Sequence, residues 1–493
     1  MDSETFRQAG HRAVEFIAEY YDGVAKMPVR ADVKPGFLLD SIPSQGPDDA
    51  ESWSDIEKDL HQKIMPGLCH WTHPGFMAYF PASSTYEGIL GELYGATFNN
   101  PAFDWICSPA ITELELVMGD WVGELLGLPQ TLRGNPSQPA STVIQGTTTE
   151  CLLVTMVAAR DWVIEAIATD EDEGGKDLVR NRLVALASSE THVSTRKAAA
   201  VAGVKFRMIE CDPSSGVAMT GSHLQDAVDQ CLREDLIPFY ATATFGTTNS
   251  CAVDDFRSIA EVKKRRPEIW IHVDGAYAGA ALACEELRAP AKGMEDFDSF
   301  SVNLGKWLLT NLDCTMLFVR KQSTVMDSMK NDCAIVENPA SADRAVTDYR
   351  DLQLAMGRRF RSLKVWFVLR SWGKDGIRRN IRRHIDMAAS FSSWIDERSD
   401  LFVHATKPQF ALNVLRVSDQ AAQKMGASPD SATLKLYNAV SANKGLWLSK
   451  TRINGYTTIR VLAANPKSTL ESLRFVFDTL CGEMHRLIDD VNV

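Results

Sequence analysis

From about residue 145, short runs of β-branched and aromatic residues alternate with stretches that have helical periodicity. The predicted strands lie at residues 183–187, 239–245, 269–274, 300–303 and 315–319, and the predicted helices at 194–202, 222–232 and 256–264. Strands that alternate with helices predict an α/β fold with a mainly parallel sheet. Because such sheets bind ligands outside the carboxyl ends of their strands, polar residues at those ends are the first candidates for a functional site.

The chain continues on both sides of this α/β region. Apolar residues between Phe6 and Tyr21 recur every three or four positions, which predicts a helix whose apolar stripe packs on a second subunit or on the same chain. Residues 377–395 are typical of a helix and 457–462 of a strand. The expected domains are a helical N-terminal segment, a large α/β domain and a small α+β C-terminal domain, over residues 1–85, 86–373 and 374–493.

Composition excludes several classes of function. The chain has 64 Asp and Glu against 52 Lys and Arg, a formal net charge of −12 that disfavours a nucleic-acid partner. No apolar run approaches the roughly 18 residues of a membrane span. The ten cysteines form no CxxC pair and no regular spacing. We therefore expect a cytoplasmic protein with reduced thiols, no membrane partner and no metal site.

Two ionisable residues stand at the ends of predicted strands. Lys306 follows the strand 300–303 within Asn-Leu-Gly-Lys-Trp-Leu-Leu, and burial in such an apolar setting would make its amine nucleophilic, as a Schiff-base lysine must be. Most lysines beside apolar residues instead extend to water. Asp274 ends the strand 269–274, where its carboxylate could hold a pyridine nitrogen protonated. The alternative is an aspartate that caps a helix or a turn.

A third element precedes a predicted helix over residues 151–167. Thr148 and Thr149 lie where hydroxyls and free backbone N–H groups could bind phosphate, although an ordinary capping box has the same composition. His192 follows the strand 183–187 and could stack on a flat ring, or be a polar loop residue. Taken together, phosphate donors, a stacking ring, a carboxylate and an amine are what pyridoxal 5'-phosphate (PLP) requires.

Longer motifs accompany these candidates: His-Trp-Thr-His-Pro (70–74), Ala-Tyr-Phe-Pro (78–81), Ser-Pro-Ala-Ile-Thr-Glu-Leu-Glu (108–115), Val-Ile-Gln-Gly-Thr (143–147), His-Val-Asp-Gly-Ala-Tyr-Ala-Gly (272–279), Lys-Trp-Leu-Leu (306–309), Thr-Asp-Tyr-Arg (347–350) and Gly-Arg-Arg-Phe-Arg-Ser-Leu-Lys (357–364). On these motifs the chain resembles, over nearly its whole length, the aromatic L-amino acid decarboxylases, a branch of the group II PLP-dependent decarboxylases. The resemblance implies the aspartate aminotransferase-like fold (fold type I), with a mainly parallel seven-stranded sheet.

The resemblance also implies roles for individual residues. Lys306 would bind the cofactor as a Schiff base, Asp274 would pair with the pyridine nitrogen, and His192 and Ala276 would sandwich the ring. The remaining cofactor contacts would come from Thr148, Thr149 and Asn303 at the phosphate and from Thr248 near the 3'-oxygen. The expected reaction is decarboxylation of tryptophan, tyrosine, phenylalanine or their hydroxylated forms to the arylethylamines.

In the family the active site forms at a dimer interface, so an obligate homodimer with shared active sites is expected. The substrate pocket would be lined by Trp71, Tyr79, Phe80, Pro81, Gly357 and Phe103 of the partner subunit. No cationic residue for a side-chain carboxylate is evident in this set, which argues against glutamate as the substrate. Gly357 occupies a position where plant relatives with indolic substrates carry glycine, which makes tryptophan plausible beside tyrosine and phenylalanine.

The chain departs from the family pattern at two places. Gly305 replaces the histidine that usually precedes the lysine, and no tyrosine occurs between Lys306 and Tyr349, where a family loop carries the tyrosine that protonates Cα. The segment 331–339 stands there instead, with Ile335 or Val336 near the expected position. The proton donor would then be His192 or water. The alternatives are an aromatic aldehyde synthase, which couples decarboxylation to oxidative deamination, and a catalytically lapsed paralogue. His192 is retained where insect aldehyde-forming relatives differ, which favours the amine.

Overall fold

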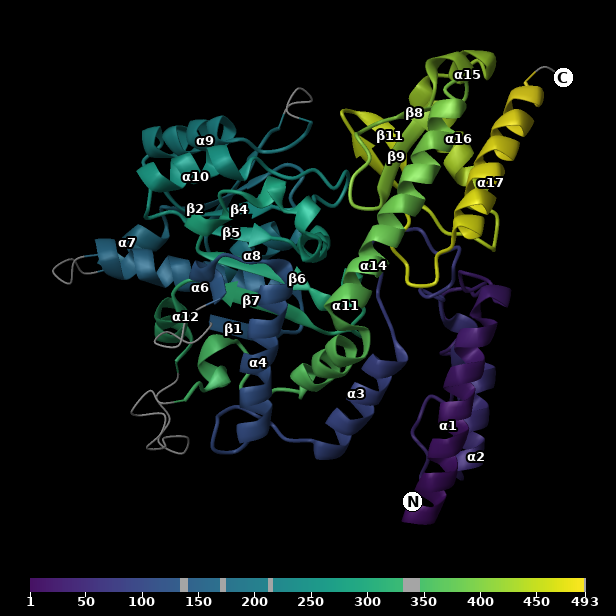
Figure 1. Ribbon diagram of the computed structural model, residues 1–493, viewed down its shortest axis with the longest axis horizontal. Helices are drawn as coiled ribbons and strands as arrows, with labels where there is room; N and C mark the ends of the chain where they lie inside the picture. Colours follow the sequence, from purple (N-terminus) through teal and green to yellow (C-terminus); the bar gives the residue numbers. More distant parts are fainter. Residues whose placement is uncertain (134–140, 169–173, 212–215, 331–345, 492–493) are drawn as a thin grey trace. The chain divides into compact units, whose positions relative to one another are not determined.

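The computed structural model describes residues 1–133, 141–168, 174–211, 216–330 and 346–491 (Figure 1). The chain forms two compact units. The larger unit comprises Ala82–Asp386 and Thr406–Asn413, and the smaller unit comprises Met1–Pro81, Met387–Ala405 and Val414–Val493. Across the described ranges, every helix is too short or too polar to cross a lipid bilayer.

The larger unit is built on a seven-stranded sheet with the strand order β1-β7-β6-β5-β4-β2-β3 (Figure 1). Its strands are β1 (Ser141–Gln145), β2 (Leu183–Ser188), β3 (Lys205–Ile209), β4 (Ile237–Thr244), β5 (Trp270–Asp274), β6 (Ser299–Asn303) and β7 (Thr315–Val319). Strands β3, β2, β4, β5 and β6 run parallel to one another. The predicted α/β fold with a mainly parallel seven-stranded sheet is confirmed.

Strand β7 differs from the expected parallel arrangement, because it runs antiparallel to both of its neighbours, β6 and β1. The link between β6 and β7, residues 304–314, holds only the short helix α11 (Leu304–Trp307). A parallel crossover needs a dozen or more residues. Because this link is shorter, the strand that follows it runs antiparallel. Strands β1 and β3 were not among the predicted strands. β3 is an edge strand with partly exposed residues, and therefore lacks a continuous apolar run.

Helices cover both faces of this sheet. The helices of the larger unit are α3 (Tyr86–Phe98), α4 (Pro109–Leu126), α5 (Gln130–Arg133), α6 (Thr148–Ile167), α7 (Gly175–Arg180), α8 (Ser194–Ala202), α9 (Gly221–Arg233), α10 (Phe256–Arg265), α11 and α12 (Gln322–Met329). Tyr240 of β4 contacts α6 through a 2.9 Å hydrogen bond with the Thr155 hydroxyl. Successive side chains of a strand point to opposite faces, and Phe245 lies an odd number of residues after Tyr240. Phe245 packs on Phe256 of α10 with ring centroids 6.1 Å apart. Helices α6 and α10 therefore lie on opposite faces.

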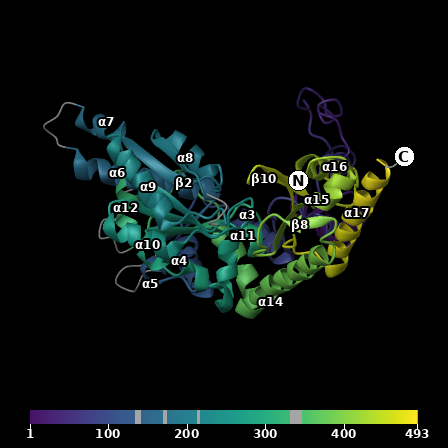
Figure 2. The same ribbon diagram turned by 90° about the horizontal axis from the view of Figure 1, so that it is seen from above.

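The smaller unit contains a four-stranded sheet with the order β10-β11-β9-β8. Its elements are α1 (Ser3–Gly23), α2 (Trp53–Asp59), β8 (Phe402–His404), β9 (Leu412–Val417), α15 (Asp419–Lys424), α16 (Pro429–Val440), β10 (Ser449–Ile453), β11 (Tyr456–Leu462) and α17 (Leu470–Asp489). Helix α16 packs against β11, and α17 packs against α16 (Figure 2). A long helix, α14 (Arg361–Glu397), contains a kink at Gly373. The α+β character expected for the C-terminal region is confirmed.

The N-terminal helix forms as predicted, but little of its apolar stripe is covered within the chain. Along α1, Ala9 is buried, whereas Phe6 and Val14 are 62% and 55% exposed. Phe16 packs edge-on against His61, with ring centroids 4.7 Å apart. Intrachain packing therefore covers part of the stripe and leaves Phe6 and Val14 exposed.

Candidate active site

Three of the predicted residues meet at the carboxyl edge of the parallel strands. His192 follows β2, Asp274 ends β5, and Lys306 lies on α11 immediately after β6. Shielding by the surrounding protein lowers the pKa of His192, the Asp274 carboxylate opposes this shift, and the Lys306 ammonium adds to it. Because each charge acts on the same imidazole, the three side chains occupy one site, as the sequence predicted.

Asp274 is fixed at the end of a fully buried strand. Its side chain is 4% exposed, and one carboxylate oxygen accepts the backbone N–H of Ala276 at 3.0 Å. Burial, followed by the charges of Glu150 and Asp274, raises the pKa of the Cys151 thiol well above its ordinary value. Cys151 lies in the first turn of α6, so this turn is within electrostatic reach of the Asp274 carboxylate.

The His192 ring is held in one tautomer. Its Nδ1 accepts the backbone N–H of Ser194 at 3.3 Å and lies 2.8 Å from the Ser194 hydroxyl, so the ring proton resides on Nε2. The loop that carries His192 is fastened to the loop after β4, because Asn249 donates a 3.0 Å hydrogen bond to Glu190. This second loop includes Thr248, the residue expected near the cofactor's 3'-oxygen.

Helix α6 begins with both features that the sequence allowed, a capping box and a candidate phosphate site. Glu150 accepts the Thr147 N–H at 3.4 Å, and the Thr147 hydroxyl accepts the Glu150 N–H at 3.3 Å, which completes the box. The Oγ1 of Thr148 is buried and makes no hydrogen bond within the part of the chain that the structure describes. A phosphate oxygen at the helix N-terminus would satisfy this hydroxyl, so the local structure fits the phosphate group of PLP.

Lys306 lies on a short helix that is clamped from several sides. Asn303 caps α11 by accepting the Gly305 N–H at 2.9 Å, which leaves its Nδ2 as the group able to donate to phosphate. Ser83 donates its N–H to the Gly305 carbonyl at 2.7 Å and its hydroxyl to the Lys306 carbonyl. Trp307 stacks on Tyr277 with ring centroids 4.8 Å apart. Ser83 is a site residue that the sequence did not reveal.

The glycine at position 305 has a local steric reason. A Cβ there would lie 3.1 Å from both the Asn303 Oδ1 and the Leu312 Cδ2, so a side chain would have to displace its neighbours. The second departure from the family pattern, the segment 331–339, lies outside the described residues.

A buried ion pair supports the strand that leads into the phosphate site. Arg358 donates to Glu115 at 2.6 Å, and each of the two side chains is 1% exposed. Glu115 also accepts the Ile144 N–H at 2.7 Å, and the Arg358 guanidinium lies 4.2 Å from the centroid of the Tyr349 ring. The pair thereby joins four of the family-like motifs and fixes the end of β1. Removing one partner of such a pair costs about 3–5 kcal/mol.

The predicted substrate residues fall in both units. Phe103 and Gly357 belong to the larger unit, where the Phe103 carbonyl accepts the Arg350 N–H at 3.0 Å. A Cβ added at Gly357 would meet no atom within 4 Å. The other four, Trp71, Tyr79, Phe80 and Pro81, belong to the smaller unit.

In the smaller unit, an aromatic cluster forms around Tyr79. Its ring stacks on Trp71 with centroids 5.7 Å apart, and Trp447 meets it edge-on at 5.8 Å. Arg460 lies 5.1 Å from the Phe80 ring centroid. This arginine is 4% exposed, and the expectation that the pocket lacks a cationic residue for a side-chain carboxylate stays a prediction. Arg460 escaped notice because 380 positions of sequence separate it from Phe80, and only folding brings the two together.

A polar row continues beneath the site along β5 and β6. Trp270 can only donate, and its Nε1 lies 2.8 Å from the Ser299 hydroxyl. The Ser299 hydroxyl then donates to Nδ1 of His272 at 2.8 Å, and the Nε2–H of His272 donates to Ser301 at 3.1 Å. Burial lowers the pKa of His272 to about 3, so this imidazole stays neutral in the folded protein.

Neutral burial of His272 makes stability depend on pH. Between pH 6.5, the ordinary pKa of histidine, and about pH 3, His272 binds a proton in the unfolded chain but not in the folded chain. Its contribution to the free energy of unfolding is therefore fully present above pH 6.5 and is lost as the pH falls. We expect wild type to lose about 1 kcal/mol more than His272→Gln between about pH 7 and about pH 5.5. Urea unfolding at both pH values measures this difference, and equal losses in the two proteins would contradict it.

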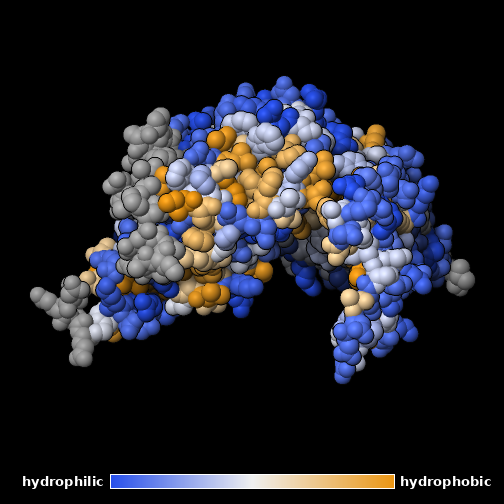
Figure 3. All heavy atoms as spheres, turned by 90° about the horizontal axis from the view of Figure 1, so that it is seen from below, coloured by the Kyte–Doolittle hydropathy of each residue, from blue (hydrophilic) through white to orange (hydrophobic). Residues whose placement is uncertain are grey.

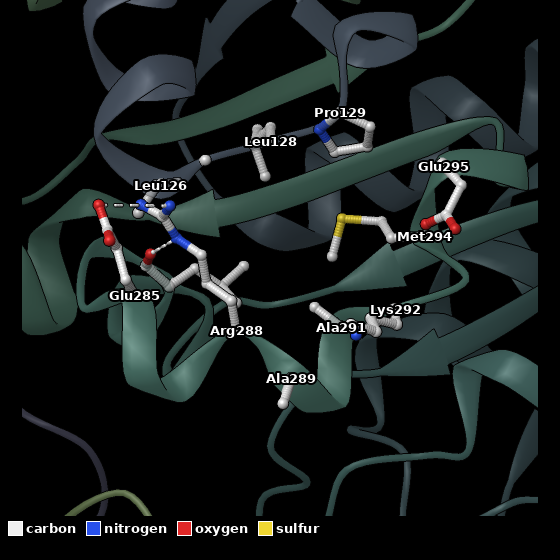
Figure 4. A pocket seen from close by; sticks show the side chains of 12 residues that line it. Leu126, Leu128, Pro129, Glu285, Arg288, Ala289, Ala291, Lys292, Met294 and Glu295 are labelled. Carbon is white, nitrogen blue, oxygen red and sulfur yellow. Dashed lines mark hydrogen bonds and ion pairs between the residues drawn. The ribbon is translucent and has the colours of Figure 1, made fainter.

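A pocket of about 380 Å³ also lies in the larger unit, but at the opposite edge of the sheet (Figure 4). Met294 and Glu295, which line it, precede β6, and Leu126 ends α4. Arg288 donates to the carbonyls of Leu282 at 2.7 Å and Leu125 at 3.1 Å, so its guanidinium caps the end of α4. The predicted cofactor residues do not line this pocket.

The chain is similar in sequence and in structure to known proteins. The model of the pyridoxal-dependent decarboxylase conserved domain matches residues 35–417. The chain is 37% identical to tyrosine decarboxylase 2 of Narcissus pseudonarcissus, covering 96% of this chain and 93% of the relative. It is also 37% identical to phenylacetaldehyde synthase of Arabidopsis thaliana, with coverages of 94% and 93%. The crystal structure of Oryza sativa TDC with PLP and tryptamine superposes with a TM-score of 0.94, 32% identity and 99% coverage of both chains.

Proposed function

The chain belongs to the pyridoxal-dependent decarboxylase family, and from this membership we propose that it converts an aromatic L-amino acid into the corresponding arylethylamine. PLP is its cofactor, and decarboxylation of aromatic amino acids is its class of reaction. The observation that carries the proposal is the convergence of His192, Asp274 and Lys306 on one site at the carboxyl edge of the sheet.

Each residue has a task that suits its surroundings. Bound PLP supplies an electron-accepting ring for the bond that breaks between Cα and the carboxylate. The Asp274 carboxylate holds a proton on the ring nitrogen, and the Lys306 amine binds the cofactor covalently. Neutral His192, with its proton on Nε2, is the group that we assign to protonation of Cα, since no tyrosine stands between Lys306 and Tyr349.

An assay of the products tests the proposal. Purified protein is incubated with PLP and, in turn, with tryptophan, tyrosine and phenylalanine, while carbon dioxide, amine, aldehyde, ammonia and hydrogen peroxide are measured. We expect one amine for each carbon dioxide and no peroxide above that of a Lys306→Ala control. Peroxide and aldehyde in amounts equal to carbon dioxide would overturn amine formation.

Aldehyde formation is the second candidate, and a specific observation favours it. The family tyrosine expected between Lys306 and Tyr349 is absent from the sequence, and one relative that is 37% identical is a phenylacetaldehyde synthase. The retained His192 supports the amine instead. A third candidate, a protein without catalysis that binds a partner, would release neither carbon dioxide nor amine in the same assay.

For the substrate, we favour an aromatic ring as large as indole. A glycine at 357 leaves open space where a side chain would stand, because an added Cβ would meet nothing within 4 Å. One similar structure holds tryptamine, and one relative is a tyrosine decarboxylase, so tryptophan and tyrosine are the first substrates to compare.

We also propose that the protein acts as a homodimer, because the larger unit exposes an extended apolar face. Viewed from below, apolar side chains gather on the part of this unit that includes α3 and α4 (Figure 3). The apolar side chains of α3 that are 44–58% exposed are Tyr86, Leu90, Leu93, Tyr94 and Phe98. Large contiguous apolar patches on soluble proteins usually mark interaction sites.

Introducing a charge into this face tests the dimer. We expect Leu93→Glu to lower the particle mass in light scattering from twice the chain mass of 54.6 kDa to the single-chain mass. Leu232→Glu is the matched control, since Leu232 is 44% exposed on α9, outside the α3 face. An unchanged mass for Leu93→Glu, or a wild type that is already monomeric, would contradict the proposal.

A further inference from the structure

Arg460 of β11 contacts two consecutive residues of the aromatic cluster and one serine of the neighbouring strand β10. The arginine is 4% exposed. Its Nη2 donates to the Tyr79 carbonyl at 3.5 Å, and its guanidinium carbon lies 5.1 Å from the Phe80 ring centroid. Its Nη1 donates to the Ser449 hydroxyl at 3.0 Å. A planar cation with several donors can hold a carbonyl, a hydroxyl and an aromatic face at once, which a lysine cannot do.

Ser449 completes a clamp on the Tyr79 backbone. Ser449 and Arg460 are direct partners in the register of β10 and β11. The Ser449 hydroxyl accepts the Tyr79 N–H at 3.3 Å, while Arg460 binds the Tyr79 carbonyl. Both polar backbone groups of one residue are therefore held by a single cross-strand pair.

The backbone of Tyr79 needs such a clamp. Its φ is 51°, in the left-handed region that a non-glycine residue adopts only when its surroundings impose it. Strained backbone of this kind is concentrated at ligand-binding sites, where it aims a side chain. The Tyr79 ring is 49% exposed and stacks on Trp71, and the Phe80 ring is partly exposed beside it. The aromatic surfaces that the clamp orients are thus open to a ligand.

We propose that Arg460 is a positioning residue for substrate recognition, which fixes Tyr79 and Phe80 so that they bind the aromatic ring of the substrate. The inference rests on the proposed function and on the role that the family resemblance implies for these two residues in the substrate pocket. The inference goes beyond that function because it makes the affinity for the aromatic ring of the substrate depend on Arg460, a buried cation that need not touch the substrate. Cofactor binding and the chemical step should then be nearly independent of Arg460.

The test compares Arg460→Met, Arg460→Lys and wild type as holoenzymes. We expect Arg460→Met to raise KM for tryptophan and tyrosine about tenfold and to leave kcat within about twofold, because uniform binding is lost without loss of transition-state stabilisation. Calorimetry with tryptamine should show a similar weakening, and PLP affinity of the apoprotein should not change. Arg460→Lys, which keeps the charge but not the fork of donors, should lie between. Arg452→Met is the matched control, since Arg452 is an exposed arginine on the same hairpin.

Three other results of this experiment would each contradict a different part of the proposal. Unchanged KM and tryptamine affinity in Arg460→Met would refute the positioning role while the proposed function stands. A parallel fall in kcat, PLP affinity and melting temperature would also refute it, because Arg460 would then only stabilise the fold. Absence of amine and aldehyde with the wild type would refute the proposed function and the inference that rests on it.

Discussion

Lys306→Ala is expected to lower turnover of aromatic amino acids by at least about 10⁴-fold, the scale of loss seen when a covalent nucleophile is removed from an enzyme. The ε-amine is the group that we expect to bind PLP covalently, and alanine has no substitute for it. The variant should still fold, because the clamp on α11 uses the main-chain carbonyls of Gly305 and Lys306 rather than the lysine side chain. Carbon dioxide release and the visible absorption of bound cofactor measure the effect.

Lys292→Ala is the matched control for this prediction. Lys292 is an exposed lysine of the same unit, and it lines the pocket at the opposite edge of the sheet. Its removal should leave turnover and cofactor absorption unchanged. Turnover by Lys306→Ala at more than about a tenth of the wild-type rate would be incompatible with covalent catalysis by this residue.

Asp274→Ala should have the second largest effect. We expect kcat to fall by about 10³-fold or more, which corresponds to about 4 kcal/mol of transition-state stabilisation, and PLP to dissociate more readily. The physical reason is that the pyridine nitrogen loses its counter-ion, so its protonated form is no longer favoured and the ring accepts electrons poorly. Asp274→Asn keeps the shape of the side chain and should show most of the same loss. Steady-state kinetics and PLP titration of the apoprotein give the two quantities.

Asp298→Asn separates this charge effect from the general cost of altering a buried carboxylate. Asp298 precedes β6 at the opposite edge of the sheet, where it pairs with Lys263 at 2.7 Å and accepts the Ile271 N–H at 2.8 Å. The Asp298→Asn substitution should lower the melting temperature of the protein while kcat and PLP affinity stay close to wild type. Equal loss of PLP affinity in Asp274→Asn and Asp298→Asn would argue that Asp274 has only a structural role.

Much of the fold could be predicted because its central strands are short, apolar and bounded by polar residues. The strand predicted at 315–319 and the helix at 194–202 match β7 and α8 residue for residue. β3 escaped prediction because Lys205 and Arg207 interrupt any apolar pattern, as an edge strand allows. The antiparallel direction of β7 could not be derived from its own residues, since it depends on the short link after β6.

Some residues of the candidate site could likewise be predicted from the sequence, and others could not. Asp274 and Lys306 could be found because each stands directly beyond a buried run, where side chains reach the functional edge of a parallel sheet. Ser83 could not be found, since its contact with Lys306 spans 223 positions. The clamp of Arg460 on Tyr79 spans 381 positions and follows from the register of a hairpin. Local sequence indicates residues that stand at strand ends, whereas residues that position them become visible only in the folded chain.

Reduction of the holoenzyme with borohydride, followed by peptide mapping, tests the central claim most directly. Borohydride converts the link between PLP and a lysine into a stable secondary amine, so the labelled peptide identifies the residue that binds the cofactor. The account predicts one labelled peptide, the one that contains Lys306, and no label in Lys306→Ala. Label on a different lysine of the wild type, or no label on any peptide, would contradict it.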